Sequence, residues 1–246
     1  MIPTSLDEEG RMVLVHCTDL TKTYRQGKIL VQALHDVSLD IESGGFVALS
    51  GPSGSGKTTL LNLIGGLDRP DTGRIVVNNR DYAQLSSAQM ADLRLHHIGF
   101  IFQSFNLIPV LSAEENVEYV MLLQGIPAKE RRDRARGILK EVGLSGMFAR
   151  RPAELSGGQQ QRVAVARAIV SNPSLVLADE PTANLDSATG EGLLQMMHSM
   201  NQSRQVTFIF STHDQMVVDC ARRVITLRDG QITDDLSKET SDVCPS

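Results

Sequence analysis

The 246-residue sequence has no tryptophan, and it has no apolar run of the roughly 18 residues that a bilayer-spanning helix needs. Any role at a membrane would therefore depend on a partner. The first ten residues carry Asp7, Glu8 and Glu9 and no apolar stretch, so we do not expect a secretory signal there. With 41% hydrophobic and 22% charged residues, the composition is that of a chain with an ordinary packed core.

Cysteine and excess basic charge are also scarce. Cys17, Cys220 and Cys244 have no metal-ligand spacing and no close pairing, so we expect reduced thiols and a cytoplasmic location. The 24 Lys and Arg residues against 29 Asp and Glu residues give a formal net charge of −5. A weakly acidic chain has no electrostatic reason to bind a phosphate backbone, and we expect no nucleic-acid partner.

Short apolar runs that end in a polar residue or a glycine recur along the chain. Strands are predicted at residues 13–17, 34–41, 46–50, 98–102, 175–178 and 206–210. Uninterrupted apolar runs are typical of parallel strands that are covered on both faces. Helix-type sequence follows three of these runs, at 46–50, 175–178 and 206–210. This alternation predicts an α/β fold built on a doubly wound sheet.

The middle of the chain has a different pattern. Between residues 112 and 142 apolar side chains recur every three or four positions, and Pro127 divides the stretch into two helices. We therefore expect a single domain over residues 1–246. Its parts are a core at about 12–104 and 156–233, a helical insert at about 105–155, and a polar tail at 234–246.

The segment from Gly51 to Thr58 has the P-loop pattern of a glycine, four residues and then Gly-Lys-Thr. Its glycines allow a tight turn in which successive N–H groups face phosphate oxygens, at the positive end of a helix. Lys57 is placed to reach the outer phosphates and the Thr58 hydroxyl to ligate Mg²⁺. The predicted nucleotide-binding residues are Gly51, Pro52, Ser53, Gly54, Ser55, Gly56, Lys57, Thr58 and Thr59.

Two acids follow the predicted strand at 175–178. Asp179 is placed to hold Mg²⁺, and Glu180, one residue on, to polarise a water for attack on a γ-phosphate. Alone, such a pair could instead cap the next element. Gln103 and His213 also follow predicted strands and could contact Mg²⁺ or water and a γ-phosphate respectively, although either residue taken singly is unremarkable.

A second glycine-rich segment runs from Leu155 to Gln159 and precedes a helix-like stretch. Ser156 stands at the N-cap position, and Gly157 and Gly158 expose backbone N–H groups, which gives a second anion site at a helix start. A single phosphate site needs only one cradle. Two copies facing each other, each completing the other's site, would use both.

With these motifs in order, the sequence resembles the ATP-binding-cassette (ABC) family over residues 12–233. The resemblance implies a RecA-like P-loop NTPase core with an N-terminal antiparallel β region and a helical subdomain. It also implies ATP and Mg²⁺ as ligands, a second copy of the chain as partner, and the residue roles of the family. Gln103 would be the Q-loop residue beside the metal, Glu180 the catalytic base and His213 the switch histidine.

Other positions match family motifs of the nucleotide site. Tyr24 resembles the A-loop aromatic that stacks on adenine, although a core tyrosine would show the same pattern. The signature residues Ser156, Gly157, Gly158 and Gln159 would contact the partner's nucleotide. Asp186 lies in a segment similar to the D-loop, with Asn184 where many members have alanine.

Finer motifs at 63–68, 102–109, 115–118 and 180–186 resemble the branch that includes lipoprotein-releasing and macrolide-export ATPases. This implies an integral-membrane transporter subunit as partner and a location on the cytoplasmic face of the membrane. The groove that receives the membrane subunit would be formed by the apolar residues after the Q-loop. These residues could instead pack inside the helical insert. These residues are Phe105, Leu107, Ile108 and Leu111.

Three alternatives remain at this stage. The basic stretch at 129–136 could meet anionic lipid, but its interleaved acids favour a solvated helix face. A soluble ABC ATPase acting on ribosomes or DNA would usually carry two cassettes or a long coiled coil, and neither is present. A small-molecule P-loop kinase would not need the signature segment.

Overall fold

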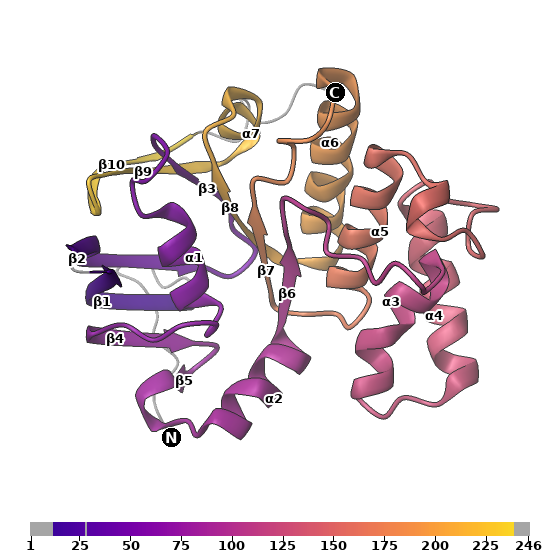
Figure 1. The fold of residues 1–246 in the computed structure, drawn as a ribbon, viewed down its shortest axis with the longest axis horizontal. Helices are drawn as coiled ribbons and strands as arrows, with labels where there is room; N and C mark the ends of the chain where they lie inside the picture. Colours follow the sequence, from indigo (N-terminus) through magenta and orange to yellow (C-terminus); the bar gives the residue numbers. More distant parts are fainter. Residues whose placement is uncertain (1–11, 28, 239–246) are drawn as a thin grey trace.

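The computed structural model describes residues 12–27 and 29–238, which form two sheets and the helices that cover them (Figure 1). The strands are β1 (Val13–Gln26), β2 (Ile29–Glu42), β3 (Phe46–Ser50), β4 (Thr72–Val77), β5 (Arg80–Asp81), β6 (Ile98–Ile101), β7 (Leu175–Asp179), β8 (Thr207–Thr212), β9 (Arg223–Arg228) and β10 (Gln231–Ser237). The α-helices are α1 (Lys57–Ile64), α2 (Ser87–His97), α3 (Ala113–Leu123), α4 (Ala128–Glu141), α5 (Gly157–Ile169), α6 (Ser187–Arg204) and α7 (Gln215–Cys220). Single 3₁₀ turns lie at Tyr82–Gln84 and Pro152–Glu154.

The central sheet has the order β10-β9-β3-β8-β7-β6, and all of its strand pairs are parallel except β9 with β10. Strand β7 shows why its apolar run is continuous. Leu175 and Leu177 pack into the core on the α1 side, whereas Val176 and Ala178 pack into the core under the helices on the other face. Parallel pairing places the C-terminal ends of β3, β7 and β8 together, because Ser50 pairs with Thr212 and Asp179 with Ser211.

The second sheet is antiparallel, with the order β2-β1-β4-β5. It packs over α1 and shares one apolar core with the α1 face of the central sheet. The predicted α/β fold and its N-terminal antiparallel region are confirmed. The strands at 13–17 and 34–41 are longer than predicted, however, because cross-strand pairing carries β1 and β2 through polar segments without alternating hydrophobicity.

Helices α3 and α4 project beside α5 on one side of the molecule (Figure 1). Ser112 begins α3 with a capping box, since its hydroxyl accepts from Glu115 N and the Glu115 carboxylate accepts from Ser112 N. The buried Asn116 side chain bonds four backbone groups of residues 108–112, which fixes the chain that enters the helix.

Two expectations need correction, and one alternative that the sequence left open gains support. Strand β10 extends to Ser237, so residues 234–237 are not part of a tail; residues 239–246 lie outside the described residues. Cys17 is a free buried thiol, as expected, but Cys220 is disulfide-bonded. Leu107 packs partly buried against the core under the helices, which favours internal packing over a role in a groove.

Within 12–27 and 29–238, no helix is both long and apolar enough to cross a membrane.

Candidate functional site

A cavity of about 640 Å³ opens where β3, β7 and β8 end, and we call it the P-loop cavity. It gathers most of the predicted site residues from distant parts of the sequence. The predicted residues that line it are Pro52, Ser53, Gly54, Ser55, Gly56, Lys57, Thr58, Thr59, Gln103, Asp179, Glu180 and His213. Val31, Gln32 and Ala33 complete the wall from β2. Sequence reasoning missed these three, because nothing local marks a strand of the other sheet as part of the site.

The loop after β3 is shaped to hold an anion. Gly56 has φ +104°, and a Cβ there would lie 2.5 Å from the carbonyl oxygen of Ala33, so only glycine fits before α1 begins. The Ser55 hydroxyl lines the cavity, is buried, and has no hydrogen-bond partner among the described residues. A buried hydroxyl without a partner costs about 1–3 kcal/mol, which a phosphate oxygen would offset.

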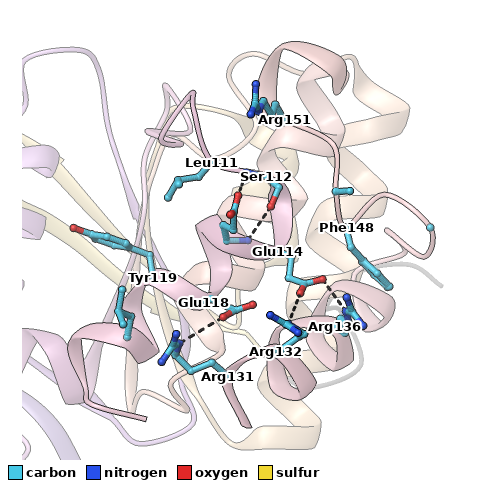
Figure 2. Close-up of a pocket in the computed structure, with 14 residues that line it drawn as sticks. Leu111, Ser112, Glu114, Glu118, Tyr119, Arg131, Arg132, Arg136, Phe148 and Arg151 are labelled. Carbon is cyan, nitrogen blue, oxygen red and sulfur yellow. Dashed lines mark hydrogen bonds and ion pairs between the residues drawn. The ribbon is translucent and has the colours of Figure 1, made fainter. Parts of the chain in front are cut away.

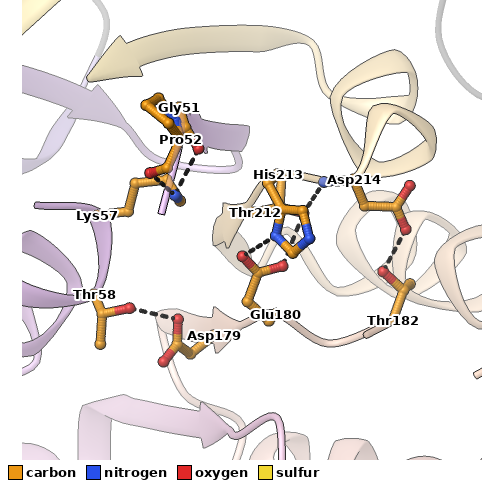
Figure 3. Close-up of polar contacts among 10 residues, drawn as sticks. All are labelled: Gly51, Pro52, Lys57, Thr58, Asp179, Glu180, Thr182, Thr212, His213 and Asp214. Atoms are coloured by element: carbon orange, nitrogen blue, oxygen red, sulfur yellow. Dashed lines mark hydrogen bonds and ion pairs between the residues drawn. The ribbon is translucent and has the colours of Figure 1, made fainter. Parts of the chain in front are cut away.

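Lys57 is held inside the same loop (Figure 3). Its Nζ donates to the carbonyl oxygens of Gly51, at 2.7 Å, and Pro52, at 2.9 Å. Burial lowers the pKa of Lys57, while the nearby carboxylates of Glu180 and Asp179 act in the opposite direction. The ammonium group is therefore positioned by the loop backbone and directed to the cavity that anionic groups would enter.

Thr58 and Asp179 form the part of the cavity suited to a hard cation. The Thr58 hydroxyl donates to Asp179 Oδ1 at 3.0 Å, across the gap between α1 and β7 (Figure 3). Mg²⁺ is usually held by one or two protein oxygens together with phosphate oxygens and waters. A hydroxyl and a carboxylate beside a phosphate cradle fit such an ion, and Gln103 lines the same cavity.

Glu180 is held at the opposite side of β7's end. It adopts φ +46°, an uncommon left-handed conformation, and its N–H donates to the Ser211 carbonyl at 2.9 Å. Its carboxylate accepts from His213 Nδ1 at 2.7 Å and from the Thr212 hydroxyl at 3.4 Å (Figure 3). A carboxylate only accepts, so Nδ1 is the donor, and the two predicted catalytic groups are in direct contact.

Asp214 is a further site residue that sequence reasoning missed. One carboxylate oxygen accepts from the Thr182 hydroxyl at 2.7 Å, and the other accepts from Met216 N, which caps α7. The backbone N–H of Asp214 donates to the Thr212 hydroxyl. Asp214 thus ties the loop that carries His213 to the turn that follows Glu180. Its signal was an aspartate directly before a helix, the usual N-cap position.

Tyr24 lies next to the P-loop cavity rather than among the residues that line it. Its hydroxyl donates to Asp68 Oδ2 at 2.8 Å, and Lys22 lies 5.1 Å from the centre of its ring and bonds the other Asp68 oxygen. Burial and the bond to Asp68 raise the pKa of Tyr24. Tyr24 pairs in the sheet with Val31, which does line the cavity.

The remaining predicted residues form a separate surface at the starts of α5 and α6. This signature surface comprises Ser156, Gly157, Gly158, Gln159 and Asp186. Ser156 Oγ accepts from Gln159 N, so its hydroxyl hydrogen is available to an incoming acceptor. Asp186 accepts from the N–H and hydroxyl of Thr189, and both bonds lower its pKa. A Cβ on Gly158 would lie 2.4 Å from Thr189 Cγ2, so glycine lets the two helix starts pack closely.

None of the signature surface lines the P-loop cavity of the same chain. The P-loop cavity and the signature surface are therefore separate parts of one chain. The family model described as ABC transporter matches residues 34–183, more than half of the chain. The chain belongs to the ABC transporter family. It is an ATP-binding cassette with the fold and the ATP-hydrolysing chemistry of that family.

Relatives fall into two groups. The macrolide export ATP-binding/permease protein MacB of Syntrophobacter fumaroxidans is 48% identical over 223 residues, which are 90% of this chain and 31% of that protein. This chain thus spans about a third of the length of such relatives. The uncharacterised ABC transporter ATP-binding protein YknY of Bacillus subtilis is 43% identical over 219 residues, 89% of this chain and 95% of that one.

A solved structure gives the same assignment. It is the dimeric post-hydrolysis state of the ATP-binding cassette MJ0796, bound to ADP and Pi, from Methanocaldococcus jannaschii. It superposes with a TM-score of 0.84 at 43% identity and covers 91% of this chain and 98% of that one. The cassette of that relative therefore forms dimers with hydrolysis products bound.

A larger cavity of about 900 Å³ lies between α3, α4 and the loop before α5, and none of the predicted nucleotide-site residues lines it (Figure 2). Its charged groups bond one another: Glu114 pairs with Arg132 and Arg136, and Glu118 with Arg131. Arg134 pairs with Glu130 along α4. Three arginines of the basic stretch at 129–136 thus pair with acids of α3, whereas Arg134 pairs with an acid of the stretch itself.

Proposed function

We propose that two copies of this chain close on two ATP–Mg²⁺, with the signature surface of one copy against the P-loop cavity of the other. The observation that carries this proposal is the separation of the two surfaces within one chain. In the closed pair, Lys57 holds the γ-phosphate from one side. Ser156 and Gly158 of the facing copy donate to it from the other.

In this proposal Glu180 accepts a proton from the attacking water, and His213 holds the Glu180 carboxylate and contacts the γ-phosphate. Thr58, Asp179 and Gln103 would hold Mg²⁺, which neutralises charge between the phosphates. When the γ-phosphate leaves as Pi, the anion that joined the two copies is lost and the pair reopens. Opening and closing of the pair is the motion that a transporter subunit would use.

We propose that the single domain divides at about 105 and 155 into core and helical insert, and that a membrane subunit docks between them. A largely apolar groove of about 600 Å³ lies there, between the α2–β6 region, α3 and α5. Phe100, Phe102, Val120 and Leu123 line this α3 groove, together with Asn106 and Arg167. Such a groove suits an apolar helix of a partner. We propose a transporter of the macrolide-export or lipoprotein-release type, in line with the relatives.

Tyr24→Ala is expected to weaken ATP binding about 2- to 10-fold, because an aromatic stack contributes about 0.5–1.5 kcal/mol beyond burial. Titration with a fluorescent ATP analogue measures the change. Tyr24→Phe is the matched control: it loses the bond to Asp68 and keeps the ring, so its affinity should stay within about twofold of wild type. Equal affinity for all three proteins would show that Tyr24 is a structural tyrosine.

Leu123→Asp is expected to abolish co-purification of a membrane subunit and to leave ATP hydrolysis by the isolated chain unchanged. Leu123 is 58% exposed in the α3 groove, so the substitution places a charge in an apolar contact without disturbing the core. Leu236→Asp is the control, since Leu236 is also 58% exposed but lies on β10. Pull-down from solubilised membranes compares the two. Retained partner with Leu123→Asp contradicts docking in the groove.

A further inference from the structure

One short segment, residues 102–106, contributes to both the P-loop cavity and the α3 groove. Gln103 lines the cavity, whereas Phe102 and Asn106, on either side of it in sequence, line the groove. Phe105 and Asn106 have φ of +59° and +48°, so two successive residues adopt the left-handed conformation. Such a turn persists only where surrounding contacts hold it.

Arg167 of α5 holds the far end of this segment. Its Nη1 donates to the carbonyl oxygen of Asn106 at 2.5 Å and its Nη2 to that of Phe105 at 2.8 Å. Arg167 is partly buried, and burial lowers its pKa. These two bonds fix residues 105 and 106 to the helix that begins at the signature surface, but they do not reach Gln103.

The near end of the segment is held by Asn184. Its Nδ2 donates to the backbone carbonyl of Gln103 at 2.8 Å. Asn184 lies in the turn that the bond from Leu185 N to Thr182 O closes, and this turn overlaps the one that the bond from Ala183 N to Glu180 O closes. Alanine, which many family members carry at this position, has no donor for the Gln103 carbonyl.

We propose that Asn184 is a positioning residue: it ties the backbone of Gln103 to the two overlapping turns that follow β7, the first of which begins at Glu180, and so sets the Gln103 amide relative to the base. The proposal rests on the roles of Gln103 and Glu180 proposed above. It adds that movement of the groove segment reaches the catalytic turn through one side-chain hydrogen bond. Asn184 acts through Gln103 and need not contact ATP.

Asn184→Ala is expected to lower kcat for ATP hydrolysis about 3- to 10-fold, the usual effect of one lost hydrogen bond. KM for ATP should stay unchanged, because the P-loop is untouched. The Mg²⁺ concentration for half-maximal activity should rise, because the Gln103 amide is less well placed. Asn184→Asp keeps the shape but cannot donate, so it should lose at least as much activity as Asn184→Ala. Gln202→Ala, an exposed amide at the other end of α6, should match wild type.

A double-mutant cycle decides whether Asn184 acts through Gln103. In a Gln103→Ala background, Asn184→Ala should cause no further loss of kcat, because the group that it positions is gone. Independent, multiplicative losses would overturn the proposal, as would wild-type kcat and Mg²⁺ dependence in Asn184→Ala. The Asn184 variants should melt within about 2 °C of wild type, because the change is confined to the surface. A loss of kcat without a lower melting temperature then reflects positioning and not unfolding. Failure of the proposed function is recognised separately, by normal turnover in Glu180→Gln.

Discussion

Glu180→Gln is expected to reduce ATP hydrolysis by about 10²- to 10⁴-fold, the usual contribution of a general base. The amide has the size of the carboxylate, and its oxygen can still accept from His213 Nδ1, so the local structure should persist. Lys57, Thr58 and the P-loop backbone are unchanged, and ATP binding should stay near wild type. Because the bridging γ-phosphate is no longer removed, the variant should accumulate as a closed dimer with ATP.

Single-turnover hydrolysis of radiolabelled ATP measures the first effect, and light scattering with and without ATP–Mg²⁺ measures the second. Glu191→Gln is the matched control, since the same chemical change at an exposed position of α6 should alter neither. Hydrolysis by Glu180→Gln at the wild-type rate would assign the base to another group. His213 would then be the first candidate, because it lines the same cavity.

The parts of the site that could be predicted from the sequence are those defined by local spacing. The P-loop and the two acids after β7 each combine an apolar strand with a turn, and parallel pairing then brings their ends together. The β2 wall of the cavity was not predicted. Val31, Gln32 and Ala33 reach the site because the antiparallel sheet packs over α1, a tertiary contact without a local sequence signal.

The α3 groove, where we propose that a partner docks, shows the same limit more sharply. Sequence reasoning assigned it to Phe105, Leu107, Ile108 and Leu111, but none of these lines the α3 groove. Phe105 and Asn106 adopt left-handed conformations, and Leu107, which follows them, packs against the core below the helices. Residues of α3 and β6 supply the apolar lining instead. Hydrophobicity alone could not show which apolar residues line the groove, because a side chain that packs in the core and one that lines a groove are equally apolar.

Mixing two inactive variants is expected to restore ATP hydrolysis. Ser156→Arg places a bulky side chain on the signature surface, and Lys57→Ala removes the ammonium from the P-loop, so each protein alone should be inactive. In a mixed dimer, the P-loop of the Ser156→Arg copy faces the intact signature surface of the Lys57→Ala copy. Random pairing makes about half of the dimers mixed, each with one of two sites complete, so activity should recover to at most about a quarter of wild type.

The result depends on which chain completes which site. If Ser156 served the P-loop of its own chain, both chains in a mixed dimer would stay defective, and mixing would restore nothing. Ser156→Arg alone should still bind ATP, since Ser156 is exposed and does not line the P-loop cavity of its own chain. The control is a chain that carries both mutations, mixed with wild type. In a mixed dimer of these two chains, no site has both a complete P-loop and a complete signature surface. If the sites are shared between two copies, the first mixture should recover activity. The control mixture should show only the activity of its wild-type homodimers.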